Sequence, residues 1–372
     1  MIELSNVTKR FPGVSSPVVD GIDMKVGEGE ICVLLGPSGC GKTTTLKMIN
    51  RLVQHTSGKI LLEGRDTDEF DVVELRRRIG YVIQQIGLFP NMTVEENICV
   101  VPHLLGWDKA KARRRAAELL EIVALDPAIY LRRYPKDLSG GQAQRVGVAR
   151  ALATDPPLML MDEPFGAIDP INREMIQDEF LNIQKKVRKT IIFVSHDIDE
   201  AVKMADRIAI FRAGKLEQFD TPDNILARPA TPFVAGFVGS DRALKRLRLV
   251  RANAALTESE CMVRAGDSSA QARAVMERNG TDRIVLVDAA NKPQGILSAA
   301  RLHGIDGVLS TAHAAPVPAL VKADDDLRTV VSSMFSIGAT WLPAVDGEGR
   351  FIGVVSQAAI VELLRVPVAE AA

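Results

Sequence analysis

Three short clusters of residues in this chain have the types and spacing needed for phosphate chemistry. The first, here called the phosphate loop, lies between an apolar run and a stretch of helical period. It contains Gly36, Pro37, Ser38, Gly39, Cys40, Gly41, Lys42, Thr43 and Thr44. This pattern, GxxxxGK[ST], brings backbone N–H groups and a helix N-terminus to the phosphates of a nucleotide. The Lys42 ammonium is then expected at the β- and γ-phosphates of ATP, and the Thr43 hydroxyl on Mg²⁺.

The second cluster is a pair of carboxylates at the end of an apolar run. Leu158–Met161 is followed directly by Asp162 and Glu163. A carboxylate at the position of Asp162 suits the shell of Mg²⁺, and Glu163, which points elsewhere, is suited to polarise an attacking water as general base. Such a pair on an arbitrary strand would be an ordinary solvated terminus. Its position downstream of a phosphate loop favours the catalytic interpretation.

The third cluster, here called the signature turn, is Leu138–Gln142, with the sequence LSGGQ. It precedes a helical stretch, Gln142–Leu152, and so offers a second helix N-terminus rich in N–H donors. A helix cap formed by Ser139 would explain the serine but not Gly140 and Gly141. Because the chain already has a phosphate loop, we expect a head-to-tail homodimer in which each signature turn, Gln142 included, closes over the ATP of its partner.

The order and spacing of these clusters over residues 1–238 resemble those of the ATP-binding cassette (ABC) ATPases. The resemblance implies two further residues near the reacting phosphate. His196 follows the apolar run Ile191–Val194 and matches the switch histidine, which contacts the γ-phosphate and the catalytic carboxylate. Gln84 matches the glutamine that ligates Mg²⁺ and senses the transmembrane partner, with Gln85 as the alternative in register.

Two more residues are implied by the same resemblance. Asp169 matches the loop that crosses to the opposite subunit. Phe11 matches the aromatic residue that stacks on adenine, a position where the family more often has tyrosine. Either ring supplies the π face that stacking needs. Taken alone, Phe11 would be interpreted as a core residue.

The fold class predicted for residues 1–238 is α/β, a P-loop NTPase of the ABC type with a helical subdomain. Apolar runs such as Leu158–Met161 and Thr190–Val194 are typical of buried parallel strands. Between them, Asp108–Leu125 has the pattern of an amphipathic helix. Residues 239–255, basic and leucine-interleaved, are predicted to form a linker helix.

An internal repeat follows the linker. Val287-Asp288 aligns with Val345-Asp346 and Gly295 with Gly353, at a constant offset of 58 residues (345 − 287) and without a gap. The copies, 256–310 and 311–372, resemble cystathionine-β-synthase (CBS) motifs, which imply a tandem α+β regulatory domain. The turns at 298–301 and 356–359 lack the Asp that adenosine-binding CBS pairs commonly use. That departure argues against an adenosine nucleotide. Trp341 is interpreted as a packing residue.

Composition limits the partners. The 372 residues carry 46 Lys and Arg against 47 Asp and Glu, so no basic field favours nucleic acid as the main partner. The four cysteines have no metal-ligand spacing and are predicted to be small buried residues. The first residues lack the pattern of a secretory signal, and no apolar stretch is long enough to span a bilayer.

An ABC core followed by tandem CBS repeats resembles the ATPase subunits of importers for glycine betaine, proline betaine, choline or carnitine. The segment Ile79–Pro90, with its Gln-Gln-Ile-Gly, resembles that subgroup in particular. The resemblance implies a homodimer on two transmembrane permease subunits, with a solute-binding protein acting through the permease. It places the chain peripherally at the cytoplasmic face of the plasma (inner) membrane, with CBS repeats that respond to ionic strength or a ligand. Two alternatives stay open here: a soluble ABC ATPase acting on nucleic acid or ribosomes, and a CBS-dominated metabolic sensor.

Overall fold

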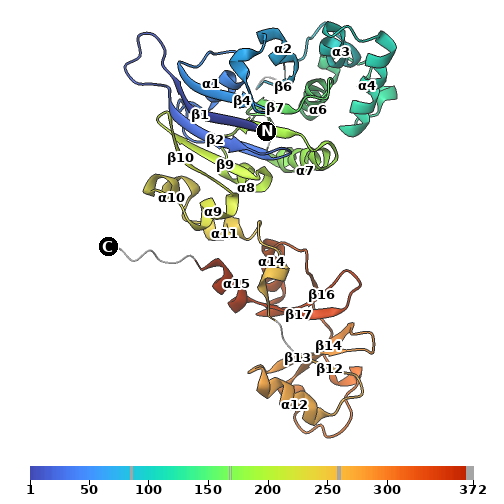
Figure 1. Ribbon diagram of the computed structural model, residues 1–372. Helices are drawn as coiled ribbons and strands as arrows, with labels where there is room; N and C mark the ends of the chain where they lie inside the picture. Colours follow the sequence, from blue (N-terminus) through green and yellow to red (C-terminus); the bar gives the residue numbers. More distant parts are fainter. Residues whose placement is uncertain (84–86, 167, 169, 258–260, 366–372) are drawn as a thin grey trace. The chain divides into compact units, whose positions relative to one another are not determined.

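The computed structural model describes residues 1–83, 87–166, 168, 170–257 and 261–365. It divides into two compact units, Met1–Gly239 and Ser240–Ala372 (Figure 1). The four cysteines are all buried free thiols, as predicted. Among the described residues, no helix combines the length and apolar character that crossing a bilayer requires.

A six-stranded sheet forms the centre of the first unit. Its order is β10-β9-β3-β8-β7-β6, with β10 antiparallel to β9 and the other neighbours parallel. The bounds are Ile31–Leu35 for β3, Ile79–Val82 for β6, Leu158–Asp162 for β7, Thr190–Val194 for β8, Arg207–Arg212 for β9 and Lys215–Asp220 for β10. Strands β3 and β8 are buried along their whole length, as expected for a parallel sheet that is covered on both faces. Because β3, β7 and β8 are parallel, the residues that follow them meet at one edge.

A second, antiparallel sheet packs onto the first through a shared apolar core. Its order is β2-β1-β4-β5, with bounds Ile2–Lys9 for β1, Val19–Val26 for β2, Ser57–Leu62 for β4 and Arg65–Asp66 for β5. Leu4 and Ile60 from this sheet join Leu34 and Leu160 of the central sheet in one buried cluster. Helix α1 (Lys42–Ile49) follows β3, α7 (Pro170–Val187) connects β7 to β8, and α8 (Ile198–Met204) connects β8 to β9. Helices α9 (Pro222–Ala227) and α10 (Pro232–Val238) follow β10.

The predicted helical subdomain is inserted between β6 and β7. Its helices are α3 (Val94–Leu104), α4 (Lys109–Ile122), α5 (Pro127–Tyr130) and α6 (Gly140–Ala151), and α2 (Val72–Arg77) precedes β6. Helix α3 packs against both α4 and α6 (Figure 1). The amphipathic helix predicted over 108–125 is confirmed as α4, which begins after the N-cap Asp108. Helix α6 starts at Gly140, earlier than predicted, because Ser139 and Gln142 form a reciprocal capping box.

The second unit repeats one architecture at the register expected from the sequence. The first copy contains β12 (Met262–Arg264), α12 (Ser269–Arg278), β13 (Arg283–Val287), β14 (Pro293–Ser298) and α13 (Ala299–Leu302). The second contains β15 (Val321–Lys322), α14 (Leu327–Ile337), β16 (Trp341–Val345), β17 (Phe351–Ser356) and α15 (Gln357–Leu364). The carboxylates of Asp288 and Asp346 accept from backbone N–H groups two and four residues downstream in both copies. The repeat found in the sequence is therefore also a repeat of the three-dimensional structure.

Each copy pairs with the segment that precedes the other copy in the sequence. Strand β11 (Leu256–Thr257) precedes the first copy in sequence, yet pairs with β17 of the second. In return, Ala315 precedes β15 but bridges Ile296 in β14 of the first copy. The predicted division into 256–310 and 311–372 therefore describes the sequence repeat but not the sheets, each of which takes a segment from the other half.

The prediction of one linker helix over 239–255 is wrong. The segment forms a short helix, α11 (Arg242–Arg246), then a turn and a 3₁₀ helix at Ala252–Ala255. Leu247 and Ala252 are buried in the core of the second CBS copy. The carbonyl of Leu247 accepts from Arg328 N–H rather than continuing a helix. The segment is an integral part of the second unit.

Candidate nucleotide-binding site

The phosphate loop connects β3 to α1, and glycines make its path sterically feasible. Gly36 has φ +143°, and a Cβ there would lie 2.2 Å from the carbonyl oxygen of Phe211. Gly41 is the N-cap of α1 with φ 106°, and a Cβ there would lie 2.6 Å from the carbonyl oxygen of Val18. Both positions therefore require glycine. Pro37, Ser38 and Gly39 form the exposed rim of the loop.

We expect Gly36→Ala to destabilise the first unit far more than Gly39→Ala. Gly39 also has a positive φ, +77°, but nothing lies within 4 Å of a Cβ there, so alanine brings backbone strain alone. That strain costs about 1 kcal/mol, whereas Gly36→Ala adds a direct overlap with backbone and should cost roughly 3 kcal/mol or more. Thermal unfolding of the two variants measures the difference. Equal unfolding midpoints would contradict the close approach at Phe211.

Lys42 occupies the centre of the phosphate loop. Its side chain is buried, and its ammonium donates to the carbonyl oxygens of Gly36 at 2.6 Å and Pro37 at 2.9 Å. The Sγ atom of Cys40 lies 3.7 Å from the same ammonium, and Cys40 is itself buried. The interpretation of Cys40 as a small packed residue fits this burial. The lysine thus places a positive charge beside the backbone of the loop, where phosphate binding needs it.

The two groups predicted to hold Mg²⁺ are in contact. The Thr43 hydroxyl donates to Asp162 Oδ1 at 3.0 Å, although the two residues come from α1 and the end of β7. Burial raises the pKa of the Asp162 carboxyl, while the hydrogen bond from Thr43 and the charge of Lys47 oppose that rise. A hydroxyl and a carboxylate are hard oxygen ligands of the kind Mg²⁺ prefers, so this donor set fits the ion. Thr44 follows at the start of α1, half-buried.

Glu163 and His196 also meet, as the resemblance implied. His196 Nδ1 lies 3.8 Å from Glu163 Oε1. Glu163 has φ 47°, a left-handed conformation that is unusual for a residue other than glycine. Its backbone N–H continues the pairing with β8 by donating to the carbonyl of Val194 at 3.1 Å. Its own carbonyl accepts from the N–H of Gly166 at 3.1 Å, so the chain turns directly after β7. This turn directs the Glu163 side chain differently from that of Asp162, and backbone strain of this kind is typical of functional sites.

The signature turn is built as a helix N-terminus open to its surroundings. Ser139 and Gln142 cap one another, and Gln142 Nε2 also donates to the Tyr130 hydroxyl at 3.0 Å. Ser139 and Gly140 are exposed, and nothing lies within 4 Å of a Cβ built at Gly140. A Cβ at Gly141, in contrast, would lie 2.8 Å from Ile176 Cδ1. Gly141 is thus explained by packing against α7, whereas Gly140 leaves space for an approaching group.

Phe11 lies in the loop after β1 with 36% of its surface exposed, so it is not a core residue. The Lys9 ammonium sits 4.8 Å from its ring centroid. The same loop ends at Val18, whose carbonyl lies beside Gly41, so it is anchored next to the phosphate loop. Gln84, its alternative Gln85, and Asp169 lie outside the described residues. Their roles stay predictions.

Sequence reasoning missed a set of polar side chains behind this site. Buried Gln177 on α7 donates to Glu200 on α8, and Arg173 on α7 lies near Asp197. Arg150 on α6 donates to the carbonyl of Gly87 at 2.7 Å, between the signature helix and the segment after β6. The signal available in the sequence was weak, because a glutamine or arginine on a long polar helix is ordinarily solvated.

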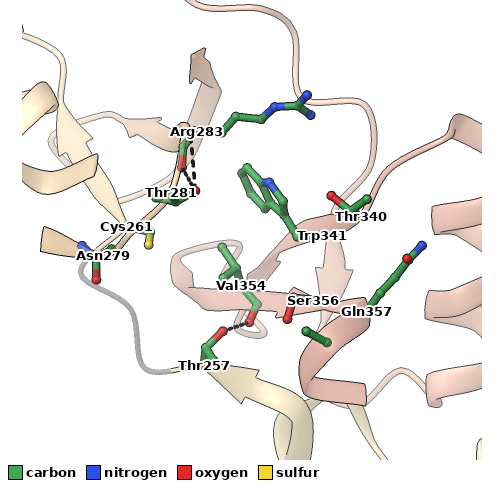
Figure 2. Close-up of a pocket in the computed structure, with 11 residues that line it drawn as sticks. Thr257, Cys261, Asn279, Thr281, Arg283, Thr340, Trp341, Val354, Ser356 and Gln357 are labelled. Atoms are coloured by element: carbon green, nitrogen blue, oxygen red, sulfur yellow. Dashed lines mark hydrogen bonds between the residues drawn. The ribbon is translucent and has the colours of Figure 1, made fainter. Parts of the chain in front are cut away.

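The second unit contains a cavity of about 560 Å³ between the CBS copies (Figure 2). Its lining residues are Thr257, Cys261, Asn279, Thr281, Arg283, Thr340, Trp341, Val354, Ser356, Gln357 and Ala358. The Trp341 ring faces the side formed by Thr281 and Arg283 (Figure 2). Trp341 therefore lines a cavity in addition to packing. The turn at 356–359, where the sequence lacks the common Asp, forms part of this wall.

Together, the phosphate loop, the Thr43–Asp162 pair, the Glu163–His196 pair and the signature turn define a P-loop ATPase of the cassette type. The sequence profile of the ABC transporter family matches residues 19–166, and that of the CBS domain matches residues 314–366. The chain belongs to the ABC transporter family, as the following relatives show.

The osmoprotectant import ATP-binding protein OsmV of Salmonella typhimurium is 52% identical over 370 residues, 98% of this chain and 96% of that protein. The glycine betaine/carnitine/choline transport ATP-binding protein OpuCA of Bacillus subtilis is 43% identical over 98% of this chain and 96% of its own length. Among solved structures, a dimeric ATP-binding cassette in a post-hydrolysis state with ADP and phosphate is 33% identical, with a TM-score of 0.53. It covers 60% of this chain and 99% of its own.

Proposed function

We propose that this chain is the ATP-hydrolysing subunit of an ABC importer for quaternary ammonium osmoprotectants such as glycine betaine, choline or carnitine. The observation that carries this proposal is the similarity to OsmV, which extends over 98% of the chain and so includes both the cassette and the CBS unit. Relatives from Bacillus and Listeria that match 98% of this chain have names that refer to choline and carnitine transport. A soluble ATPase acting on nucleic acid and a stand-alone metabolic sensor are not favoured, because relatives matched over this length are named as import or transport proteins.

The arrangement of the described residues supports this proposal. Lys42 and the backbone N–H groups of the phosphate loop hold the phosphates. Thr43 and Asp162 would hold Mg²⁺, with Gln84 as a further ligand, and the ion supplies charge neutralisation at the transferred phosphoryl group. Glu163 accepts the proton of the attacking water, and His196 orients Glu163 and contacts the γ-phosphate. The exposed ring of Phe11 stacks on adenine.

The signature turn completes the site of a second copy. Ser139, the N–H groups of Gly140 and Gly141, and Gln142 close over the ATP of the partner, and the loop containing Asp169 crosses between the copies. Closure of this homodimer drives two transmembrane permease subunits, through which a solute-binding protein delivers its cargo. The chain is peripheral at the cytoplasmic face of the membrane. The open space at Gly140 supports the approach of the partner copy to the signature turn.

Purification from native membranes tests this assignment. We expect the tagged chain to co-purify with a multi-spanning permease and to hydrolyse ATP in that complex. Recovery only in a ribosome-bound or nucleic-acid-bound fraction would overturn the proposed function. Uptake of radiolabelled glycine betaine by cells with and without the chain then identifies the substrate class, and unchanged uptake would exclude it.

The CBS unit is proposed to regulate hydrolysis by ionic strength or a ligand, and a cut at the unit boundary tests this. A chain ending at Gly239 should keep its ATPase activity but lose its dependence on salt, because the boundary between compact units falls there. A chain ending at Ala255 is the informative comparison. It retains Leu247 and Ala252 without the core that buries them, so we expect it to aggregate. Salt dependence that persists after the cut at Gly239 would refute regulation by the CBS unit.

A further inference from the structure

A buried polar network lies behind the switch turn, defined as Ser195–Asp197. Glu200 in the first turn of α8 is only 7% exposed, which is unusual for a carboxylate. It accepts hydrogen bonds from the hydroxyl of Ser195 and from Gln177 Nε2, the latter at 3.0 Å. Burial raises the pKa of the Glu200 carboxyl, and these two hydrogen bonds oppose that rise. Burying a carboxylate costs free energy unless it is hydrogen-bonded. The groups that bind Glu200 therefore indicate which part of the structure it holds in place.

The partners of Glu200 fix the backbone on both sides of His196. The Ser195 oxygen, held by Glu200, accepts from the N–H of Asp197 at 3.0 Å. The Asp197 carboxylate caps α8 by accepting from the N–H groups of Asp199 and Glu200. The residues before and after His196 are therefore constrained, while the imidazole itself is 65% exposed. The turn therefore sets the position of the His196 backbone, from which the imidazole extends.

Helix α7 connects this turn to the loop that precedes the helix. Arg173 donates to the carbonyl of Ile168 at 3.0 Å, and its Nη1 lies 3.8 Å from Asp197 Oδ2. Gln177 lies one helical turn further along α7, so both side chains project from the same face. Arg173 thus contacts both the loop before α7 and the switch turn, and Gln177 contacts the switch turn through Glu200.

We propose that Gln177 and Glu200 are positioning residues that hold the switch turn so that His196 reaches Glu163, and that α7 ties this turn to the loop containing Ile168. The proposal rests on the proposed ATPase function and deepens it.

The test uses two buried glutamines of the same helix. Gln177 is 3% and Gln184 is 8% exposed, and both are hydrogen-bonded, but Gln184 binds the backbone of Gly29 and Lys189, away from the switch turn. In the full-length chain we expect Gln177→Met to lower kcat at saturating MgATP by at least about tenfold, with KM changed by less than about twofold. Gln184→Met should lower thermal stability but leave kcat within about twofold.

Two further variants separate positioning from folding. Glu200→Gln should keep kcat near that of the parent, because Gln177 can rotate its amide and both hydrogen bonds survive, whereas Glu200→Ala should lose kcat as Gln177→Met does. In a His196→Ala background, Gln177→Met should have no further effect on kcat, since it acts through that histidine. If Gln177→Met does not fold, Arg173→Gln carries the same comparison.

The outcomes are distinct. Equal kcat for Gln177→Met and Gln184→Met, or an undiminished effect of Gln177→Met without His196, would overturn the positioning role. Failure of the unmodified chain to hydrolyse ATP would instead overturn the proposed function. The inference is supported by a fall in kcat for Gln177→Met and Glu200→Ala, together with a parental kcat for Glu200→Gln. It also requires that Gln177→Met cause no further fall in the His196→Ala background.

Discussion

Glu163→Gln is expected to reduce ATP turnover to background while ATP still binds. Glutamine keeps the shape of the side chain but cannot accept a proton from water at neutral pH, and loss of a general base typically costs about 10²–10⁴-fold in rate. Lys42 and the Thr43–Asp162 pair are unchanged, so the phosphates and the metal ion keep their ligands. With hydrolysis blocked, an ATP-bound dimer should accumulate. Steady-state phosphate release and size-exclusion chromatography with and without ATP measure the two effects.

The control for this experiment is a Glu→Gln change of the same chemistry elsewhere in the unit. Glu217 on β10 accepts from the Thr231 hydroxyl and belongs to the antiparallel strand at the sheet edge. Glu217→Gln should leave turnover within about twofold of the parent chain. Hydrolysis that survives Glu163→Gln would remove Glu163 from the role of general base. Loss of ATP binding would mean that the carboxylate supports the fold of the loop instead.

The geometry of the candidate nucleotide-binding site could be predicted because its signals are local. The phosphate loop requires glycines at fixed offsets, and the structure gives the reason at Gly36, where any Cβ would overlap the backbone of Phe211. Strand β8 coincides with the predicted run Thr190–Val194. A strand that is buried on both faces is apolar along its whole length, so its first and last residues can be identified from the sequence. The contacts of Thr43 with Asp162 and Glu163 with His196 then follow from parallel strands ending at one edge.

The errors arose where structure depends on distant partners. The segment 239–255 has leucines and arginines at helical spacing, but its carbonyl groups bind the backbone of the second CBS copy, which ends the helix early. Strand β11 is two residues long and pairs with β17, nearly a hundred residues away, so no local pattern marks it. Glu200 and Gln177 look like surface residues in sequence. Their burial becomes visible only when α7 and α8 are placed side by side.

Mixing two inactive variants is expected to restore ATPase activity if the site is shared between copies. Lys42→Ala removes the charge that holds the phosphates, and Gly140→Asp places a carboxylate on the exposed signature turn, facing the phosphates of a partner. The second change should not disturb folding, because space is open at Gly140 and an acidic residue in the first turn of α6 suits the helix dipole. Each variant alone should be inactive, since every site in its homodimer carries the defect.

In a heterodimer of these variants, a head-to-tail arrangement puts both defects in one site and leaves the other site intact. Co-expression with different tags and purification through both tags should therefore recover a substantial fraction of parental activity, measured as phosphate release. Dimers of two Lys42→Ala chains, one with each tag, are the matched control and should stay inactive. If instead each signature turn served the phosphate loop of its own chain, both sites of the mixed dimer would be defective. Absence of recovery in a verified heterodimer would thus refute the shared site and leave Gly140 without the role that its open surroundings support.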